Sequence, residues 1–140
     1  MADILPISND EHIKLVEHIN SLSMKESYKK EIVLLATLLR TTGLRKKEVF
    51  MLNSKHVHEA LSSKEFSLDT GRAVVVISLT NEDHSELAEV FDGFVLDSSA
   101  EISLFNYKED LLMKKLAFHM KKCLGKWFST YSYRLAYKSR

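Results

Sequence analysis

An apolar stretch that ends in a glycine turn constrains this chain more than any other feature of its sequence. Residues 32–39 read Ile-Val-Leu-Leu-Ala-Thr-Leu-Leu and are apolar at nearly every position. A helix that is apolar nearly all round is stable only when it is buried. The stretch therefore predicts the central helix of the fold. Gly43 follows shortly after and predicts the end of that helix, because glycine is the residue most often found just past a helix C-terminus.

A second, short amphipathic helix is predicted after the glycine, from about Leu44 to Leu52. Val49, Met51 and Leu52 are expected to supply its core contacts. Arg45 and Glu48 are three residues apart and would share one face of the helix. A helix start has free N–H groups and the positive end of the helix dipole, and both favour an anion. Together with Arg45, this turn predicts a phosphate site.

Length and composition favour one globular domain over residues 1–140. The apolar fraction of 45% and the charged fraction of 28% are ordinary values for such a domain. One proline and four glycines leave few forced breaks, so long helices are expected. The sequence shows neither a signal peptide nor an apolar run of the roughly 18 residues that a membrane span needs. We therefore expect a cytoplasmic, nucleoid-associated protein without a membrane partner.

Charge is distributed unevenly along the chain. Residues 73–107 contain seven acidic residues and no Lys or Arg, whereas residues 108–140 contain nine Lys and Arg against two acids. Such an asymmetry suggests that the basic part binds a polyanion. A solvated face on an ordinary basic helix is the alternative explanation.

The remaining elements can be predicted from capping and periodicity. Ser8 and Glu11 form an S-x-x-E capping box that opens a helix, with His12 and His18 expected on its outer face. The single cysteine, Cys123, is expected to be buried. No metal or cofactor is expected, since the spacing of the histidines and cysteine matches no common ligand set. Further predicted elements are a β-hairpin (65–68 and 72–79), a helix from Ser85 to about Phe91, a helix over 109–124 and a helix that begins near 129. The predicted fold class is thus mainly α with a small β-hairpin.

The glycine turn resembles the first active-site box of the tyrosine recombinases, or phage integrases, whose pattern is T-G-x-R-x-x-E-x-x-x-L. Here the box reads Thr42-Gly43-Leu44-Arg45, then Glu48, then Leu52. The second box of that family, H-x-x-R at a helix start, is similar to Tyr131-Ser132-Tyr133-Arg134, in which Tyr131 replaces the histidine. The resemblance implies the catalytic-domain fold of that family and a role in DNA recombination or integration.

The resemblance also implies roles for individual residues. Arg45 and Arg134 would clamp the non-bridging oxygens of a DNA phosphate, Glu48 would support the first arginine, and Tyr131 would donate a hydrogen bond. These four are the candidate catalytic residues. The candidate DNA-binding residues are the basic side chains near the first box and in the C-terminal third: Arg40, Lys46, Lys47, Lys121, Lys122 and Lys138.

Two parts of the family's machinery are not found. The family places a catalytic lysine in a hairpin turn, which we expect at Thr80–Asp83, and residues 73–107 contain no lysine. The nucleophilic tyrosine of the family lies well beyond the second box. We therefore expect a domain that is C-terminally incomplete, a fragment or a relative that binds DNA and is not competent alone for strand cleavage and rejoining.

Two alternatives stay open. The chain could be a helical protein–protein interaction module that docks a partner through residues 109–124 and has no nucleic-acid role. It could also be an enzyme that a partner's tyrosine completes in trans. DNA is the expected partner, with a homo-oligomer or a partner protein as further possibilities.

Overall fold

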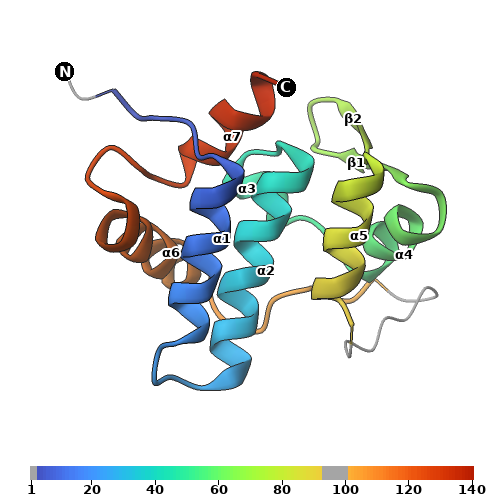
Figure 1. Cartoon of the computed structure of the whole chain (residues 1–140). Coiled ribbons are helices and arrows are strands. Elements are labelled where there is room, and N and C mark those ends of the chain that lie inside the picture. The colour runs from blue at the N-terminus through green and yellow to red at the C-terminus, as the bar shows by residue number, and fades with distance from the viewer. Residues whose placement is uncertain (1–2, 93–100) are drawn as a thin grey trace.

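The structure is a computed structural model and describes residues 3–92 and 101–140. In these residues, the helices pack together into one body, and a single two-stranded antiparallel sheet lies to one side of them (Figure 1). The predicted fold class, mainly α with a small β-hairpin, is confirmed. The elements are α1 (Asn9–Asn20), α2 (Glu26–Thr42), α3 (Lys46–Val49), α4 (Ser54–Ser63), β1 (Glu65–Asp69), β2 (Val74–Ser78), α5 (Asn81–Val90), α6 (Glu109–Leu124) and α7 (Tyr131–Lys138).

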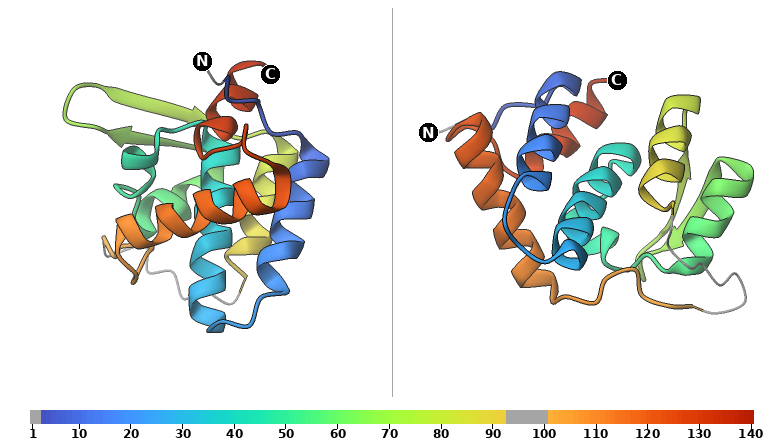
Figure 2. Two further views of the ribbon diagram at one scale, coloured as in Figure 1. Left: turned by 90° about the vertical axis from the view of Figure 1, so that its left-hand side faces the viewer. Right: turned by 60° about the horizontal axis from the view of Figure 1, so that its bottom comes forward.

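Helix α2 is the centre of the fold, as its apolar sequence predicts. Ile32, Leu34 and Leu35 are fully buried. Helices α1, α5, α6 and α7 each pack against α2, and the views from two further directions show them arranged around it (Figure 2). A helix covered on so many sides needs apolar residues around most of its circumference.

Gly43 ends α2 in the predicted way. Its φ angle of 66° lies in the left-handed region, and its N–H donates to the carbonyl of Leu39 at 3.3 Å. A side chain at this position would also overlap the ring of Tyr137, which lies directly against the glycine. Backbone conformation and close packing therefore both require glycine here.

The helix predicted over 44–52 is shorter than expected. Only Lys46–Val49 forms α3, and the chain leaves it through further tight turns. Leu44, Val49 and Leu52 are buried, but Met51 is exposed, so its predicted core contact is wrong. A single helical turn presents only one side to the core, and Met51 falls on the other side.

The β-hairpin is confirmed, and the helix after it begins earlier than predicted. Phe66 of β1 pairs with Ile77 of β2, and both side chains are buried. Helix α5 begins at Asn81 instead of Ser85, because the Thr80 hydroxyl accepts a hydrogen bond from the Asp83 N–H at 3.1 Å and caps the helix.

The two histidines of α1 are more buried than the local sequence pattern predicts. His12 is buried, whereas Ile13 is 47% exposed. The expectation that His12 faces outward is wrong, because its ring hydrogen-bonds the buried hydroxyl of Tyr133 at 2.7 Å. His18 is half-buried, and its Nε2 lies 3.1 Å from the Nδ1 of His119 on α6.

Helix α6 has the predicted bounds and packs on α1 and α2. Leu112, Leu116 and Met120 form its buried face. Cys123 is half-buried and not fully buried as expected, since it lies at the edge of that face. None of the helices within 3–92 and 101–140 combines the length and apolar character that a membrane crossing requires.

Candidate phosphate-binding pocket

Arg45 and Arg134 line one surface pocket, although they lie far apart in the sequence. The pocket has a volume of about 210 Å³ and lies where α7 crosses the turn between α2 and α3. Leu39 and Leu44 form apolar walls, and the remaining lining residues are polar or basic: Arg45, Lys46, Thr130, Tyr131 and Arg134. The two arginines thus meet in space only because α7 packs against α2.

Arg134 is anchored to the glycine turn. Its Nη1 donates a hydrogen bond of 2.8 Å to the carbonyl oxygen of Gly43, and its side chain is half-buried. A guanidinium carries five N–H donors in a fixed planar fork. The bond to Gly43 uses one of them and fixes the position of the plane beside the pocket.

Arg45 and Glu48 are linked through the backbone. Arg45 stands at the N-cap of α3, and its N–H donates to the Glu48 carboxylate at 2.9 Å. The Arg45 side chain is exposed. Glu48 therefore holds the turn that carries Arg45.

Tyr131 begins α7 and also lines the pocket. It is 44% exposed, and its backbone N–H donates to the Ser129 hydroxyl at 3.2 Å. Its phenol can donate a hydrogen bond to an anion in the pocket. The walls that Leu39, Leu44 and Thr130 provide are a part of the pocket that sequence reasoning missed, although Leu44 lies within the matched box and Leu39 lies shortly before it.

The lysines predicted to bind DNA fall into two groups. Lys46 lines the pocket, Lys47 follows it on α3 and Lys138 is exposed near the end of α7. Lys121 and Lys122 lie instead in the last turn of α6, away from the lining of the pocket.

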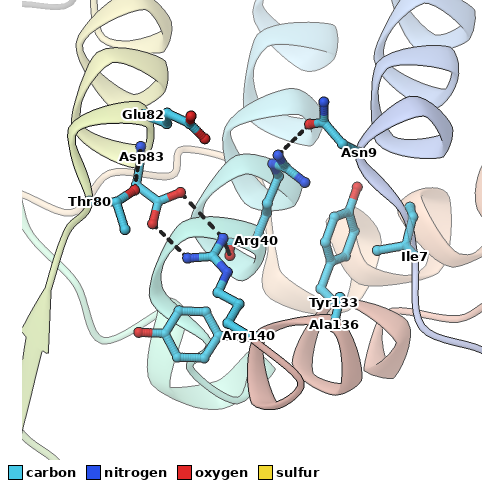
Figure 3. Close-up of a pocket in the computed structure, with 10 residues that line it drawn as sticks. Ile7, Asn9, Arg40, Thr80, Glu82, Asp83, Tyr133, Ala136 and Arg140 are labelled. Carbon is cyan, nitrogen blue, oxygen red and sulfur yellow. Dashed lines mark hydrogen bonds and ion pairs between the residues drawn. The ribbon is translucent and has the colours of Figure 1, made fainter.

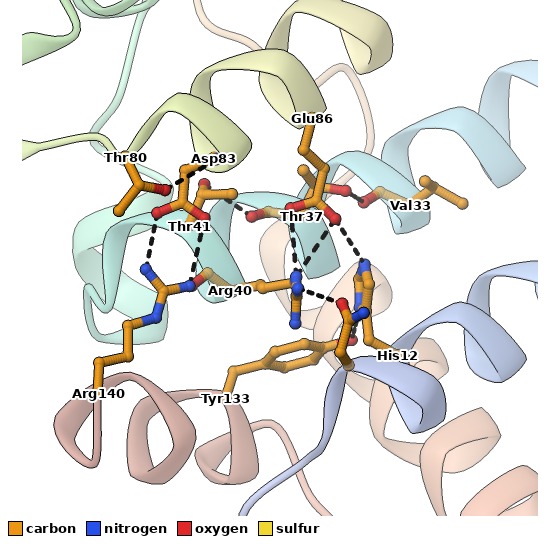
Figure 4. Close-up of polar contacts among 11 residues, drawn as sticks. His12, Val33, Thr37, Arg40, Thr41, Thr80, Asp83, Glu86, Tyr133 and Arg140 are labelled. Carbon is orange, nitrogen blue, oxygen red and sulfur yellow. Dashed lines mark hydrogen bonds and ion pairs between the residues drawn. The ribbon is translucent and has the colours of Figure 1, made fainter.

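Arg40 does not extend this basic surface. Its Nε donates to both carboxylate oxygens of Glu86 at 3.2 Å (Figure 4). Its Nη2 donates to the side-chain oxygen of Asn9 (Figure 3). His12 approaches the same carboxylate at 3.5 Å while it bonds Tyr133. Arg40 thus has protein partners at its Nε and Nη2, and it does not line the pocket of Arg45 and Arg134.

Asp83 and Arg140 form a second ion pair between α5 and the end of the chain. The guanidinium of Arg140 donates to the two carboxylate oxygens at 2.7 and 3.3 Å, and Asp83 is buried. Arg40, Asp83, Tyr133 and Arg140 border a separate cavity of about 460 Å³ (Figure 3). These contacts tie α7 to α2 and α5.

The pKa values of Tyr133 and Glu86, the two acids beside Arg40 and His12, follow from their burial and their contacts. Burial raises the pKa of the Tyr133 phenol far above its ordinary range, so Tyr133 stays protonated. Burial would also raise the pKa of Glu86, but its contacts with His12 and Arg40 outweigh that effect and lower the pKa below its ordinary value. Glu86 is therefore an anion at neutral pH, as its ion pair with Arg40 requires.

Comparison with known proteins defines the class of this fold. It is the fold of the tyrosine recombinase catalytic domain, present in part. The solved structures that it matches include a XerA recombinase, with a TM-score of 0.68 and 17% identity, and an integrase of the transposon Tn1549 in complex with a circular intermediate DNA, with a TM-score of 0.61 and 14% identity. No protein-family model and no curated protein matches the sequence.

The match covers nearly all of this chain and half of the known structures. It extends over 98% of this chain in both cases, over 50% of the recombinase and over 52% of the integrase. The chain thus spans about half the length of the solved structures that it matches.

The structure corrects the place of the hairpin turn. Thr80–Asp83, where the family's lysine was expected, forms the start of α5, because Thr80 caps that helix. The turn that joins β1 to β2 spans residues 70–73 and carries Arg72. Lys64 precedes β1, and its Nζ donates to the Asn81 side chain at 2.6 Å.

Proposed function

We propose that this chain binds the phosphate backbone of duplex DNA through the pocket between Arg45 and Arg134. The observation that carries the proposal is the convergence of these two arginines on one pocket. The fold shared with recombinases, one of them solved on DNA, supports a DNA phosphate as the anion.

The chemistry of the pocket suits a phosphate diester. Two guanidinium groups can bind the non-bridging oxygens from two sides, each through two parallel N–H donors. A pair of lysines would fix the position of the phosphate less closely, because an ammonium group acts as a point charge. Lys46 adds a third positive charge, and Tyr131 adds a neutral donor. Leu39 and Leu44 give the pocket apolar walls, and charged hydrogen bonds are stronger beside apolar surface than in open water.

We further propose that the described residues bind DNA without cleaving it. Cleavage in the manner of the tyrosine recombinases needs an ionisable nucleophile at the bound phosphate. Tyr133 is buried with a raised pKa, and the ring of Tyr137 is packed on Gly43. Tyr131 occupies the place of the family's histidine. A cytoplasmic, nucleoid-associated location is part of the same proposal.

Fluorescence anisotropy with a labelled duplex, in low and in moderate salt, tests this function. Arg45→Gln should weaken binding and reduce the slope of log K against log salt by about one unit, because one phosphate contact is lost. Since the Arg45 side chain is exposed, this change leaves the fold intact.

Lys30→Gln is the matched control. Lys30 is an exposed cation on α2, close to the end of that helix opposite Gly43, and its removal changes the net charge equally. Equal losses of affinity in the two variants would mean that general charge, and not the pocket, binds the DNA. An absence of binding by the unmodified chain in low salt would refute the proposal altogether.

The alternative of an interaction module predicts a different result. Its apolar stripe on α6 is largely used within the chain, because Leu112, Leu116 and Met120 are buried against α1 and α2. If Arg45→Gln and Lys30→Gln both leave nucleic-acid affinity unchanged, this second function is favoured. Completion in trans would instead give a covalent DNA adduct only when a tyrosine-donating partner is added.

A further inference from the structure

Helix α6 presents an apolar pair to solvent that the DNA-binding pocket does not use. Leu111 is 44% exposed and Phe118 is 56% exposed. They are seven residues apart and therefore lie on the same face, two turns from one another. Lysines border this pair on both sides along the helix: Lys114 and Lys121 on one side, Lys115 and Lys122 on the other.

The geometry of this face differs from that of a phosphate-binding surface. A phosphate backbone offers little apolar surface to an exposed phenyl ring, whereas a protein groove does. The Nζ of Lys122 lies 5.9 Å from the centre of the Phe118 ring, so charge and ring form one continuous surface. We call this surface, centred on Leu111 and Phe118, the α6 outer face.

A groove between α1 and α5 has the complementary character. It has a volume of about 380 Å³. Ile13 and Val16 of α1, Val33 of α2 and Val90 of α5 form its apolar lining. Acidic residues stand on both walls: Glu17 on the α1 side, Glu86 and Glu89 on the α5 side.

From this match we infer that the α1–α5 groove of one copy of the chain receives the α6 outer face of a second copy. Each part of the face has a counterpart in the groove. Leu111 and Phe118 would cover the exposed side chain of Ile13. The two rows of lysines would face Glu17 on one wall and Glu89 on the other, since Glu86 is already paired with Arg40. Ion pairs at the rim would set the register and speed of association, while the apolar contact would supply most of the affinity.

The choice of a second copy rests on charge complementarity within the sequence itself. Residues 73–107, which include α5, carry seven acids and no Lys or Arg, and residues 108–140, which include α6, carry a large excess of Lys and Arg. The groove and the face lie on different sides of α1, since α6 packs on one side and α5 borders the other (Figure 2). One copy therefore cannot fill its own groove.

The inferred contact is head-to-tail, because it joins two different surfaces. Every copy in such an association keeps one free face and one free groove, so further copies can add until a ring closes. The contact involves one helix face and one groove, which places it among small, weak interfaces. Association should therefore depend on protein concentration and weaken as salt rises.

Sedimentation velocity over a range of protein concentrations, without DNA, tests the inference. The unmodified chain should form dimers and larger species at high concentration. Phe118→Asp and Ile13→Asp should each lower the association constant by roughly tenfold or more, because each would bury an unpaired carboxylate in an apolar contact. Both positions are exposed in the monomer, and circular dichroism verifies that the variants stay folded.

A mixture of the two variants gives the sharpest result. Phe118→Asp keeps an intact groove, and Ile13→Asp keeps an intact α6 outer face, so the mixture should form one-to-one dimers that do not grow further. The Glu89→Lys, Lys122→Glu double variant exchanges the two charges within one chain, so it should associate more strongly than either single variant, and this gain should shrink as salt rises. The inference is overturned if the unmodified chain stays monomeric at every concentration, if either variant associates as the unmodified chain does, or if the mixture fails to dimerise.

Discussion

The guanidinium of Arg134 donates a hydrogen bond of 2.8 Å to the carbonyl oxygen of Gly43, the residue that ends the central helix. This bond joins the two parts of the sequence that resemble recombinase boxes. The turn that exposes Arg45 is therefore also the turn that positions Arg134, and any change in its conformation should disturb both arginines.

Gly43→Ala should destabilise the fold by roughly 2–4 kcal/mol, through a strained left-handed φ angle and overpacking against a neighbouring side chain. The neighbour is the ring of Tyr137, which a methyl group would overlap. Urea denaturation measures the change. Gly71→Ala is the control, because its φ of 87° is strained in the same way but nothing lies within 4 Å. Similar losses in the two variants would show that the Tyr137 contact contributes little.

The pair between Asp83 and Arg140 should contribute to stability because it satisfies a buried carboxylate. Arg140→Gln should cost roughly 1–3 kcal/mol, as a buried charged acceptor loses its donors. The Asp83→Asn, Arg140→Gln double variant should cost less than the sum of the two single variants, since the pair acts as a unit. Thermal and urea unfolding of the unmodified chain, the two single variants and the double variant complete this double-mutant cycle. Strict additivity would mean that the pair is uncoupled.

Glu86 should make the fold sensitive to acid. Because its contacts with His12 and Arg40 lower its pKa in the folded state, the unfolded state binds a proton more readily. The stability that Glu86 supplies is present above its unfolded pKa, which is about 4.3, and is lost as pH falls through its folded pKa. Glu86→Gln should therefore be less stable than the unmodified chain at neutral pH, and the difference should shrink below about pH 4. A difference that stays constant with pH would contradict this prediction.

His119 should give a separate pH response at a higher pH. Burial lowers the pKa of His119, and the charges of His18, Lys115 and Lys122 lower it further. As pH falls, His119 therefore takes up its proton at a higher pH in the unfolded state than in the folded state. The free energy of unfolding should fall as pH drops below about 6.5, the ordinary pKa of histidine. His119→Gln should flatten the stability profile between about pH 5 and 7. Urea midpoints measured at several pH values test this, with His58→Gln as an exposed control.

Local sequence patterns determined most of the helices and strands. The bounds of α6 and the hairpin pairing follow from apolar periodicity and turn residues, which depend only on near neighbours. The end of α2 at Gly43 follows from the backbone freedom of a single residue. The resemblance at Thr42–Arg45 and at Tyr131–Arg134 likewise predicted the fold that the structure has.

Only the tertiary structure decided where the polar side chains go. Arg40 and Arg45 look alike in the sequence, yet Arg40 is held by Glu86 and Asn9 while Arg45 faces a pocket. His12 is buried because Tyr133, far away in the chain, supplies its partner. Sequence alone determined which segments are apolar enough to pack, because that depends on composition and period. The partners of each charge depend on contacts between distant segments, and these form only when α5 and α7 pack on α2.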